Sequence, residues 1–77
     1  MEKYLIELDT KVNGKWQKGY HENLTNNENK QAMNVYVQHI TSDKRKAKRF
    51  YDKEEAQKFA TLFESQFQTA KVITINR

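Results

Sequence analysis

The residues of this sequence best suited to contacting charged partners form a basic cluster in its second half. Five of the six residues from 44 to 49 are cationic, and the aromatic pair Phe50 and Tyr51 follows. The cations are Lys44, Arg45, Lys46, Lys48 and Arg49. Cations neutralise phosphates, and a ring such as that of Tyr51 can stack on a base. The cluster therefore predicts a nucleic-acid contact, a contact with an acidic protein surface, or a solvated edge strand whose lysines oppose aggregation.

The rest of the chain lacks the residue sets that support catalysis or cofactor binding. His21 and His39 are the only imidazoles and there is no cysteine, whereas a zinc site usually needs three or four protein ligands. Ser42 and Ser65 have no motif that places a base and an oxyanion hole around them. The two glycines cannot form a glycine-rich phosphate loop. We therefore expect no enzyme activity, no metal, no cofactor and no small-molecule substrate.

Two aromatic residues near the start of the chain are further candidates for a binding surface. Trp16 and Tyr20 lie together in the segment expected to form the second strand. They could complete a contact with a partner, or they could pack against the sheet and the core. Both interpretations stay open from the sequence.

Length and composition predict one small domain over residues 1–77. The chain has 77 residues and 36% hydrophobic residues, which is enough for one modest core. Without the segment 44–49, nine of the fourteen basic residues remain against ten acidic ones, so the body is close to neutral. Charged residues at positions 2, 3, 7 and 9 interrupt any apolar run at the start. We expect no membrane contact and a cytoplasmic location, in a host cell if the protein is encoded by a phage.

Several short strands must position these residues. Tyr4, Ile6 and Leu8 alternate with polar residues, with Leu5 as the exception, which predicts a half-buried strand. Asn13-Gly14 predicts a type I′ hairpin turn into a second strand over 16–20. Residues 21–32 are rich in asparagine and predict a mobile polar loop, and residues 34–40 predict a third strand. A short fourth strand is expected over 46–50.

One helix and a closing strand complete the predicted fold. Asp52 precedes Glu54 and Glu55 in the manner of a helix cap, and apolar residues then follow at helical spacing. The apolar stripe consists of Ala56, Phe59, Ala60, Phe63 and Phe67. The β-branched run over 72–75 predicts the last strand. The sequence thus predicts an α+β fold with a small, mainly antiparallel sheet in the order ββ-loop-ββ-α-β, and an amphipathic helix packed on one face.

The segment that joins the basic cluster to the helix also carries a resemblance. Residues 44–60, KRKAKRFYDKEEAQKFA, resemble small accessory proteins of Gram-positive phages and mobile elements, in which a basic strand ends in an aromatic residue before a capped helix. They are also similar to the strand-helix junction of arm-type DNA-binding domains of tyrosine integrases. That family's sheet meets DNA, which implies that Lys44, Lys46 and Lys48 lie near phosphates. The long Asn-rich segment and the strand after the helix depart from the integrase pattern.

These observations lead to three functional hypotheses. The first is a non-catalytic binding module of phage or mobile-element origin that binds a host protein, with inhibition of a host defence nuclease as one mode. The basic cluster would steer it toward an acidic patch, and Trp16, Tyr20 and residues 21–32 would complete the contact. The alternative is a nucleic-acid-binding accessory protein that contacts phosphates through residues 44–49. The third is a homodimer built by pairing of sheet edges.

Overall fold

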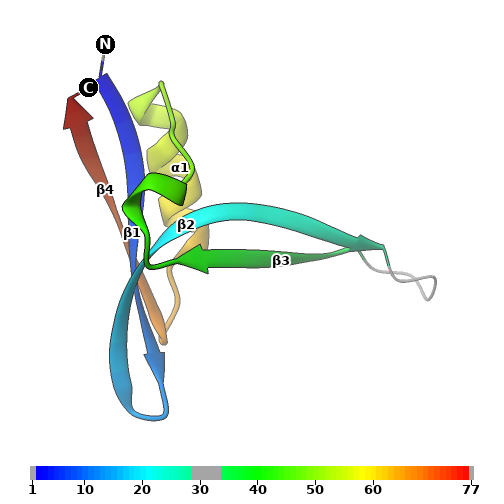
Figure 1. Ribbon diagram of the computed structural model, residues 1–77. Helices are drawn as coiled ribbons and strands as arrows, with labels where there is room; N and C mark the ends of the chain where they lie inside the picture. Colours follow the sequence, from blue (N-terminus) through cyan, green and yellow to red (C-terminus); the bar gives the residue numbers. More distant parts are fainter. Residues whose placement is uncertain (1, 29–33, 77) are drawn as a thin grey trace.

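The chain folds into one antiparallel sheet with a helix against one side. The computed structural model describes residues 2–28 and 34–76. The elements follow in the order β1 (Glu2–Val12), β2 (Lys15–Glu28), β3 (Asn34–Thr41), η1 (a 3-10 turn, Lys44–Lys46), α1 (Lys53–Phe63) and β4 (Gln68–Asn76) (Figure 1). The strands pair in the order β3-β2-β1-β4, so β3 and β4 are the edges of the sheet. The predicted α+β class, with an antiparallel sheet and one packed helix, is confirmed.

The first hairpin has the predicted turn. Val12 pairs with Lys15, so Asn13 and Gly14 form a two-residue connection between β1 and β2. Asn13 has φ 53° and Gly14 has φ 80°, and a type I′ turn requires positive φ at both positions. Asparagine and glycine tolerate this left-handed conformation better than other residues. The two residues therefore fix the register of the sheet's two central strands.

β2 pairs with two different strands along its length. Its first part, Lys15 to Tyr20, pairs with β1, and its second part, from Tyr20 onward, pairs with β3. The register shifts between His21 and Asn23, which leaves Glu22 as the extra residue of a bulge. Because a bulge bends its strand, the second half of β2 leaves the body of the sheet together with β3. We call this projecting hairpin the arm (Figure 1).

The arm corrects the prediction of a polar loop over 21–32. Residues 21–28 belong to β2 and pair with β3, and residues 29–32 lie outside the described residues. Strand pairing uses backbone N–H and C=O groups, which every residue here provides whatever its side chain. A polar segment without alternation can therefore still form a strand when a partner strand is available.

The segment 46–50 also differs from its prediction as a strand. The Asp43 side chain accepts a hydrogen bond from the Arg45 backbone N–H at 2.9 Å, and the Asp43 carbonyl accepts one from the Lys46 N–H at 3.0 Å. These bonds close the turn η1 where a strand was expected. Pairing is restored only at Phe50, which forms a single bridge with Tyr4. An Asp side chain that bonds to nearby backbone groups offers an alternative to strand pairing.

The helix begins as predicted and ends one turn earlier. The Asp52 carboxylate accepts a hydrogen bond from the Glu54 N–H at 3.0 Å, which caps the first turn. Ala56 and Ala60 are fully buried. α1 ends at Phe63, and Phe67 is 59% exposed outside it, so the prediction that Phe67 extends the helical stripe is wrong. The turn from Ser65 to Gln68, which leads into β4, takes the place of a further helical turn.

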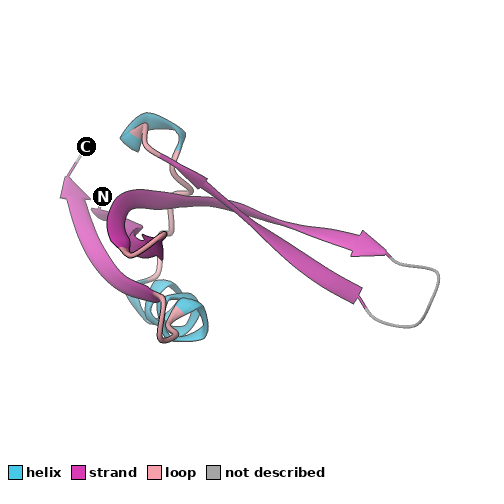
Figure 2. Cartoon of the chain, turned by 90° about the horizontal axis from the view of Figure 1, so that it is seen from below, coloured by secondary structure: helices cyan, strands magenta, loops and turns pink. Residues whose placement is uncertain are grey.

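Buried residues lie on both sides of the sheet. On the helix side Ile6, Leu8 and Phe50 pack with the two buried alanines of α1. Leu5 is also fully buried but points to the opposite side, because side chains alternate along a strand. Ala47, just after η1, is only 3% exposed and lies outside the helix-side cluster. Figure 2 shows α1 and η1 on opposite sides of the sheet, so the η1 segment lies on the side to which Leu5 points.

His21 is buried in the helix-side core, which the prediction of a loop at this position missed. Its ring centroid lies 4.6 Å from that of Phe63 and 6.3 Å from that of Phe50. Burial, and to a smaller extent the nearby charge of Lys48, lowers the pKa of His21 to about 4. Its Nδ1 lies 3.5 Å from the amide nitrogen of Gln38, which suits a neutral ring that accepts a hydrogen bond there.

Candidate functional site

The side of the sheet that carries η1, which we call the η1 face, collects most of the sequence-predicted site residues. The pairing register assigns side chains to this face, since directly paired residues point the same way and Leu5 pairs with Ile73. On the strands β1, β2 and β4 its members are Lys3, Leu5, Glu7, Asp9 and Lys11 of β1, Trp16, Lys18 and Tyr20 of β2, and Thr69, Lys71, Ile73 and Ile75 of β4. Trp16 and Tyr20 therefore share the face that η1 partly covers.

The exposed aromatic residues differ in how they are placed. Trp16 is 52% exposed and pairs with Lys11, and Tyr20 is half-buried and pairs with Glu7. Neither side chain belongs to the helix-side core. Both side chains therefore lie outside that core, while packing against the sheet stays open for the half-buried Tyr20. Tyr51 is 63% exposed at the end of the basic segment.

The backbone of the basic segment runs beside the first half of β1. Phe50 and Tyr4 exchange two backbone hydrogen bonds of 2.8 Å, and the Lys48 N–H donates to the His21 carbonyl at 2.9 Å. Phe50 points into the helix-side core, so Arg49 points to the η1 face by the alternation of an extended chain. The segment thus occupies the place beside β1 that β2 leaves when it bends into the arm.

Two of the cations are held by hydrogen bonds within the segment. The Arg45 guanidinium donates through Nε and Nη2 to the two carboxylate oxygens of Asp43, both at 3.3 Å. These bonds lower the pKa of Asp43, and the Arg45 backbone N–H adds to the effect. The Asp43 carboxylate in turn raises the pKa of Arg45. Arg49 donates through Nη1 to the carbonyls of Arg45 at 3.1 Å and Ala47 at 3.3 Å.

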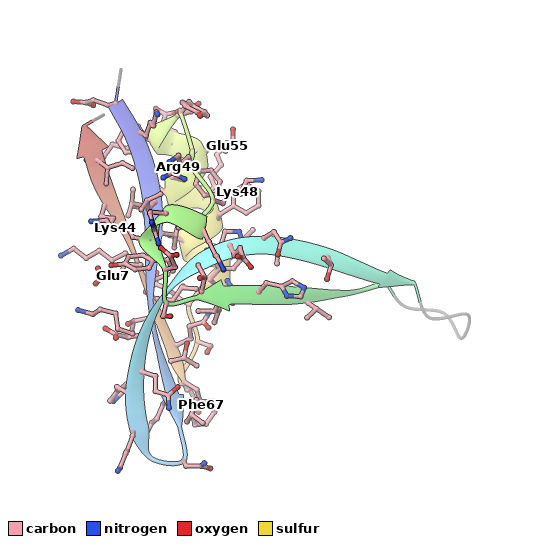
Figure 3. All side chains as sticks on the ribbon, viewed as in Figure 1. Glu7, Lys44, Lys48, Arg49, Glu55 and Phe67 are labelled. Atoms are coloured by element: carbon pink, nitrogen blue, oxygen red, sulfur yellow. The ribbon has the colours of Figure 1, made fainter. Side chains whose placement is uncertain are left out.

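The structure divides the five predicted cations into two groups. Lys44, Arg45 and Arg49 line a pocket of about 200 Å³ whose remaining wall is Ile75 of β4. Lys48 lies elsewhere, with its Nζ 5.7 Å from the centroid of the Phe50 ring. Lys46 is exposed and does not line the pocket. Figure 3 labels Lys44, Lys48 and Arg49 around η1 beside the upper half of β1.

The η1 face is positively charged as a whole, which the sequence did not show because its other cations are scattered along the chain. Its cations are Lys3, Lys11, Lys18, Lys71, Lys44, Arg45 and Arg49. Its strands contribute two carboxylates, Glu7 and Asp9. Lys18 forms a salt bridge with Glu7, and Arg45 forms one with Asp43. The other five of these seven cations have no salt bridge among the described residues.

A second hollow lies on the helix side, between α1 and the base of the arm. It measures about 570 Å³ and is lined by Leu24, Gln38, Phe59, Leu62, Phe63 and Gln68. Leu62 is 76% exposed and Leu24 is 37% exposed. The sequence did not predict this groove, since Leu24 was assigned to a loop and Leu62 lies off the apolar stripe. We call it the helix-arm groove.

Two negative observations apply to the residues that the structure describes. Within 2–28 and 34–76, no group of three or more histidine, cysteine, aspartate or glutamate side chains is placed to hold a metal ion. In the same part of the chain, no helix has the length and apolar character needed to cross a membrane.

Comparisons of the chain with models of protein families, with curated proteins and with solved structures gave no significant match. The resemblance of residues 44–60 to phage accessory proteins and integrase arm domains therefore stays a prediction.

Proposed function

We propose that this protein is a non-catalytic module that binds single-stranded nucleic acid across its η1 face. The proposal rests on one observation, which is that cations from four separate segments gather with Trp16 and Tyr20 on the same face of the sheet. Non-specific binding of single strands combines a basic surface that follows the backbone with aromatic side chains on which bases stack. Trp16 is 52% exposed, so its ring is accessible for stacking.

The length of the η1 face suits an extended single strand of nucleic acid. From Lys3 to Lys11 the β1 backbone rises over eight residue steps, or about 26 Å at ~3.3 Å per residue. Trp16 pairs with Lys11 at one end of this length, and the pocket beside Ile75 lies near the other end, where Ile75 pairs with Lys3. Bases would stack at the aromatic end, and the phosphates would follow the cations along the whole length.

The test is a salt titration of binding to a fluorescently labelled single-stranded oligonucleotide, read by anisotropy. Five unpaired cations predict a slope of log K against log salt near ~-3.5 for a single strand, by the counterion relation of about -0.7 per neutralised phosphate. A duplex of the same sequence should bind more weakly, because its bases cannot stack on Trp16. Absence of binding to either form at low salt would overturn the proposal.

Two double variants with equal charge changes test which face binds. Lys11→Ala with Lys71→Ala removes two cations of the η1 face, and Lys53→Ala with Lys58→Ala removes two exposed cations of α1. We expect the first pair to weaken binding and to reduce the magnitude of the salt slope by about 1.4, and the second pair to change both far less. Equal effects of the two pairs would contradict binding at the η1 face.

A second candidate function is the binding of a host protein, as expected for a phage or mobile-element accessory protein that inhibits a defence nuclease. The helix-arm groove favours it, because its lining is largely apolar and Leu62 at its rim is 76% exposed. Pull-down from nuclease-treated host lysate, compared with the variant Leu62→Asp, tests it. Recovery of no host protein, or of the same proteins by the variant, would exclude this function.

A further inference from the structure

The pocket beside η1 differs from the rest of the basic segment. Lys44, Arg45 and Arg49 surround it, and its one apolar wall is Ile75. These three cations come from η1 and the extended segment after it, whereas Ile75 belongs to β4, on the opposite side of β1 from β2. The segment therefore crosses the η1 face and brings its cations to the far edge of the sheet.

Both guanidinium groups of the pocket already form hydrogen bonds within the basic segment. Arg45 donates two hydrogen bonds to Asp43, through Nε and Nη2. Arg49 donates through Nη1 to two carbonyl oxygens. Nη1 of Arg45, and Nε and Nη2 of Arg49, have no hydrogen-bond partner among the described residues. These bonds orient the two groups, so each loses less side-chain entropy on binding a ligand than a side chain without any partner would.

The charge of the pocket is matched to a phosphoryl group. Three cations lie around it, and the carboxylate of Asp43 neutralises one of them, so the net charge is close to +2. Nε and Nη2 of Arg49 can form two parallel hydrogen bonds to the oxygens of a phosphate, and Nη1 of Arg45 can donate a further one. Ile75 would contact the apolar side of a sugar or base attached to that phosphate. Arg45 is also accessible, since 89% of its side chain is exposed.

We propose that this pocket is a phosphoryl-binding site, which one phosphate of the nucleic acid fills in the complex. The identity of the polymer rests on the proposed function above, whereas binding of a phosphoryl group to the pocket does not. The proposal separates Lys44, Arg45 and Arg49, which hold the phosphate, from Lys46 and Lys48, which only add to the electrostatic potential. All five would contribute alike if the segment were a uniformly basic stretch.

The test uses NMR spectra of the full chain labelled with ¹⁵N, in which the side-chain Nε–H signals of arginine are resolved. Titration with inorganic phosphate should shift the signals of Arg45 and Arg49 in a saturable manner. Acetate at equal ionic strength should produce no saturable shift of these signals. Saturation by acetate with the same affinity would identify a general anion site, suited to an acidic protein, and would overturn the phosphoryl assignment.

Matched variants then separate the pocket from the charge of the segment. Arg45→Ala with Arg49→Ala, and Lys46→Ala with Lys48→Ala, each remove two positive charges. We expect the arginine pair to lose phosphate saturation and to weaken oligonucleotide binding about tenfold more than the lysine pair does. Equal losses from the two pairs would overturn the proposal.

A third variant keeps the charge and guards against a folding defect. Arg45→Lys with Arg49→Lys retains both cations but removes the planar forks, so phosphate saturation should still be lost while thermal unfolding confirms a folded chain. Retained saturation in this variant would contradict the role of the arginine forks.

Two oligonucleotides, one with a 5′-phosphate and one with a 5′-hydroxyl, show whether the pocket binds a terminal or an internal phosphate. A 5′-phosphate that tightens binding about tenfold, with the gain lost in the arginine variant, assigns the pocket to a strand terminus. Equal binding of the 5′-phosphate and 5′-hydroxyl forms, with the arginine effect retained, assigns it to an internal diester. Phosphate saturation without oligonucleotide binding would support the pocket and refute the proposed function. Oligonucleotide binding that the arginine variants leave unchanged would support the proposed function and refute the pocket as a phosphoryl-binding site.

Discussion

Acidification should destabilise this protein through a single residue, His21. Its ring is 2% exposed, lies against Phe63 and Phe50, and has a pKa lowered to about 4 by burial and then by the charge of Lys48. An unfolded chain exposes the same imidazole to water, where its pKa is near ~6.5. Between these two values the unfolded chain carries a proton that the folded chain does not, so the free energy of unfolding rises with pH.

The size of the effect follows from the two pKa values. The stabilisation by a neutral His21 is complete above pH 6.5 and is lost as the pH falls toward 4. Linkage gives a loss of about 2 kcal/mol between pH 7.5 and 5.0, and of roughly 3 kcal/mol by pH 4. For a small domain with a thin core this is a large share of the total stability.

Urea denaturation followed by circular dichroism from pH 7.5 to 5.0 measures this loss, because most carboxylates stay ionised over that range. His21→Leu should remove most of the pH dependence, and His39→Gln, which removes the chain's other imidazole, should leave it in place. A free energy of unfolding that stays constant over this range in the native protein would refute the reasoning. So would an equal pH dependence in His21→Leu.

Further predictions concern the packing of the two sides of the sheet. Leu5→Ala should cost about 2–5 kcal/mol because Leu5 is fully buried on the η1 face, whereas Leu62→Ala should cost less than about 0.5 kcal/mol; urea denaturation compares them. Gly19→Ala should destabilise by about 1–3 kcal/mol, since a Cβ there would lie 2.6 Å from Ile40 Cγ2, and Ile40→Ala should restore part of the loss in thermal unfolding. Asp52→Ala should cost about 1 kcal/mol and reduce helical circular dichroism.

The parts of the fold that the sequence predicts well are determined by neighbouring residues. Asn13-Gly14 specifies its turn through backbone conformation, and Asp52 caps its helix through a bond to the N–H of a residue two positions away. Tyr4, Ile6 and Leu8 alternate because β1 has one face on the helix-side core. Leu5 broke that alternation in the sequence, and its burial on the η1 face explains the exception.

The parts that the sequence did not predict depend on contacts between distant residues. The second half of β2 has no apolar alternation and is formed by backbone pairing with β3. The same bend buries His21 and opens the space beside β1 that the basic segment enters. The basic segment was identified from its composition, but its division into a pocket and separate lysines depends on the turn η1 and on the bridge between Phe50 and Tyr4, neither of which its composition shows.

The central claim is that nucleic acid lies across the η1 face, and the fluorescence of Trp16 tests it most directly. Trp16 is the only tryptophan of the chain, and it is exposed on that face, far along β1 from the basic pocket. Stacking of a base on the indole should quench its fluorescence in a saturable manner, with the same midpoint as the anisotropy titration. Binding by anisotropy that leaves the Trp16 emission unchanged would contradict the claim.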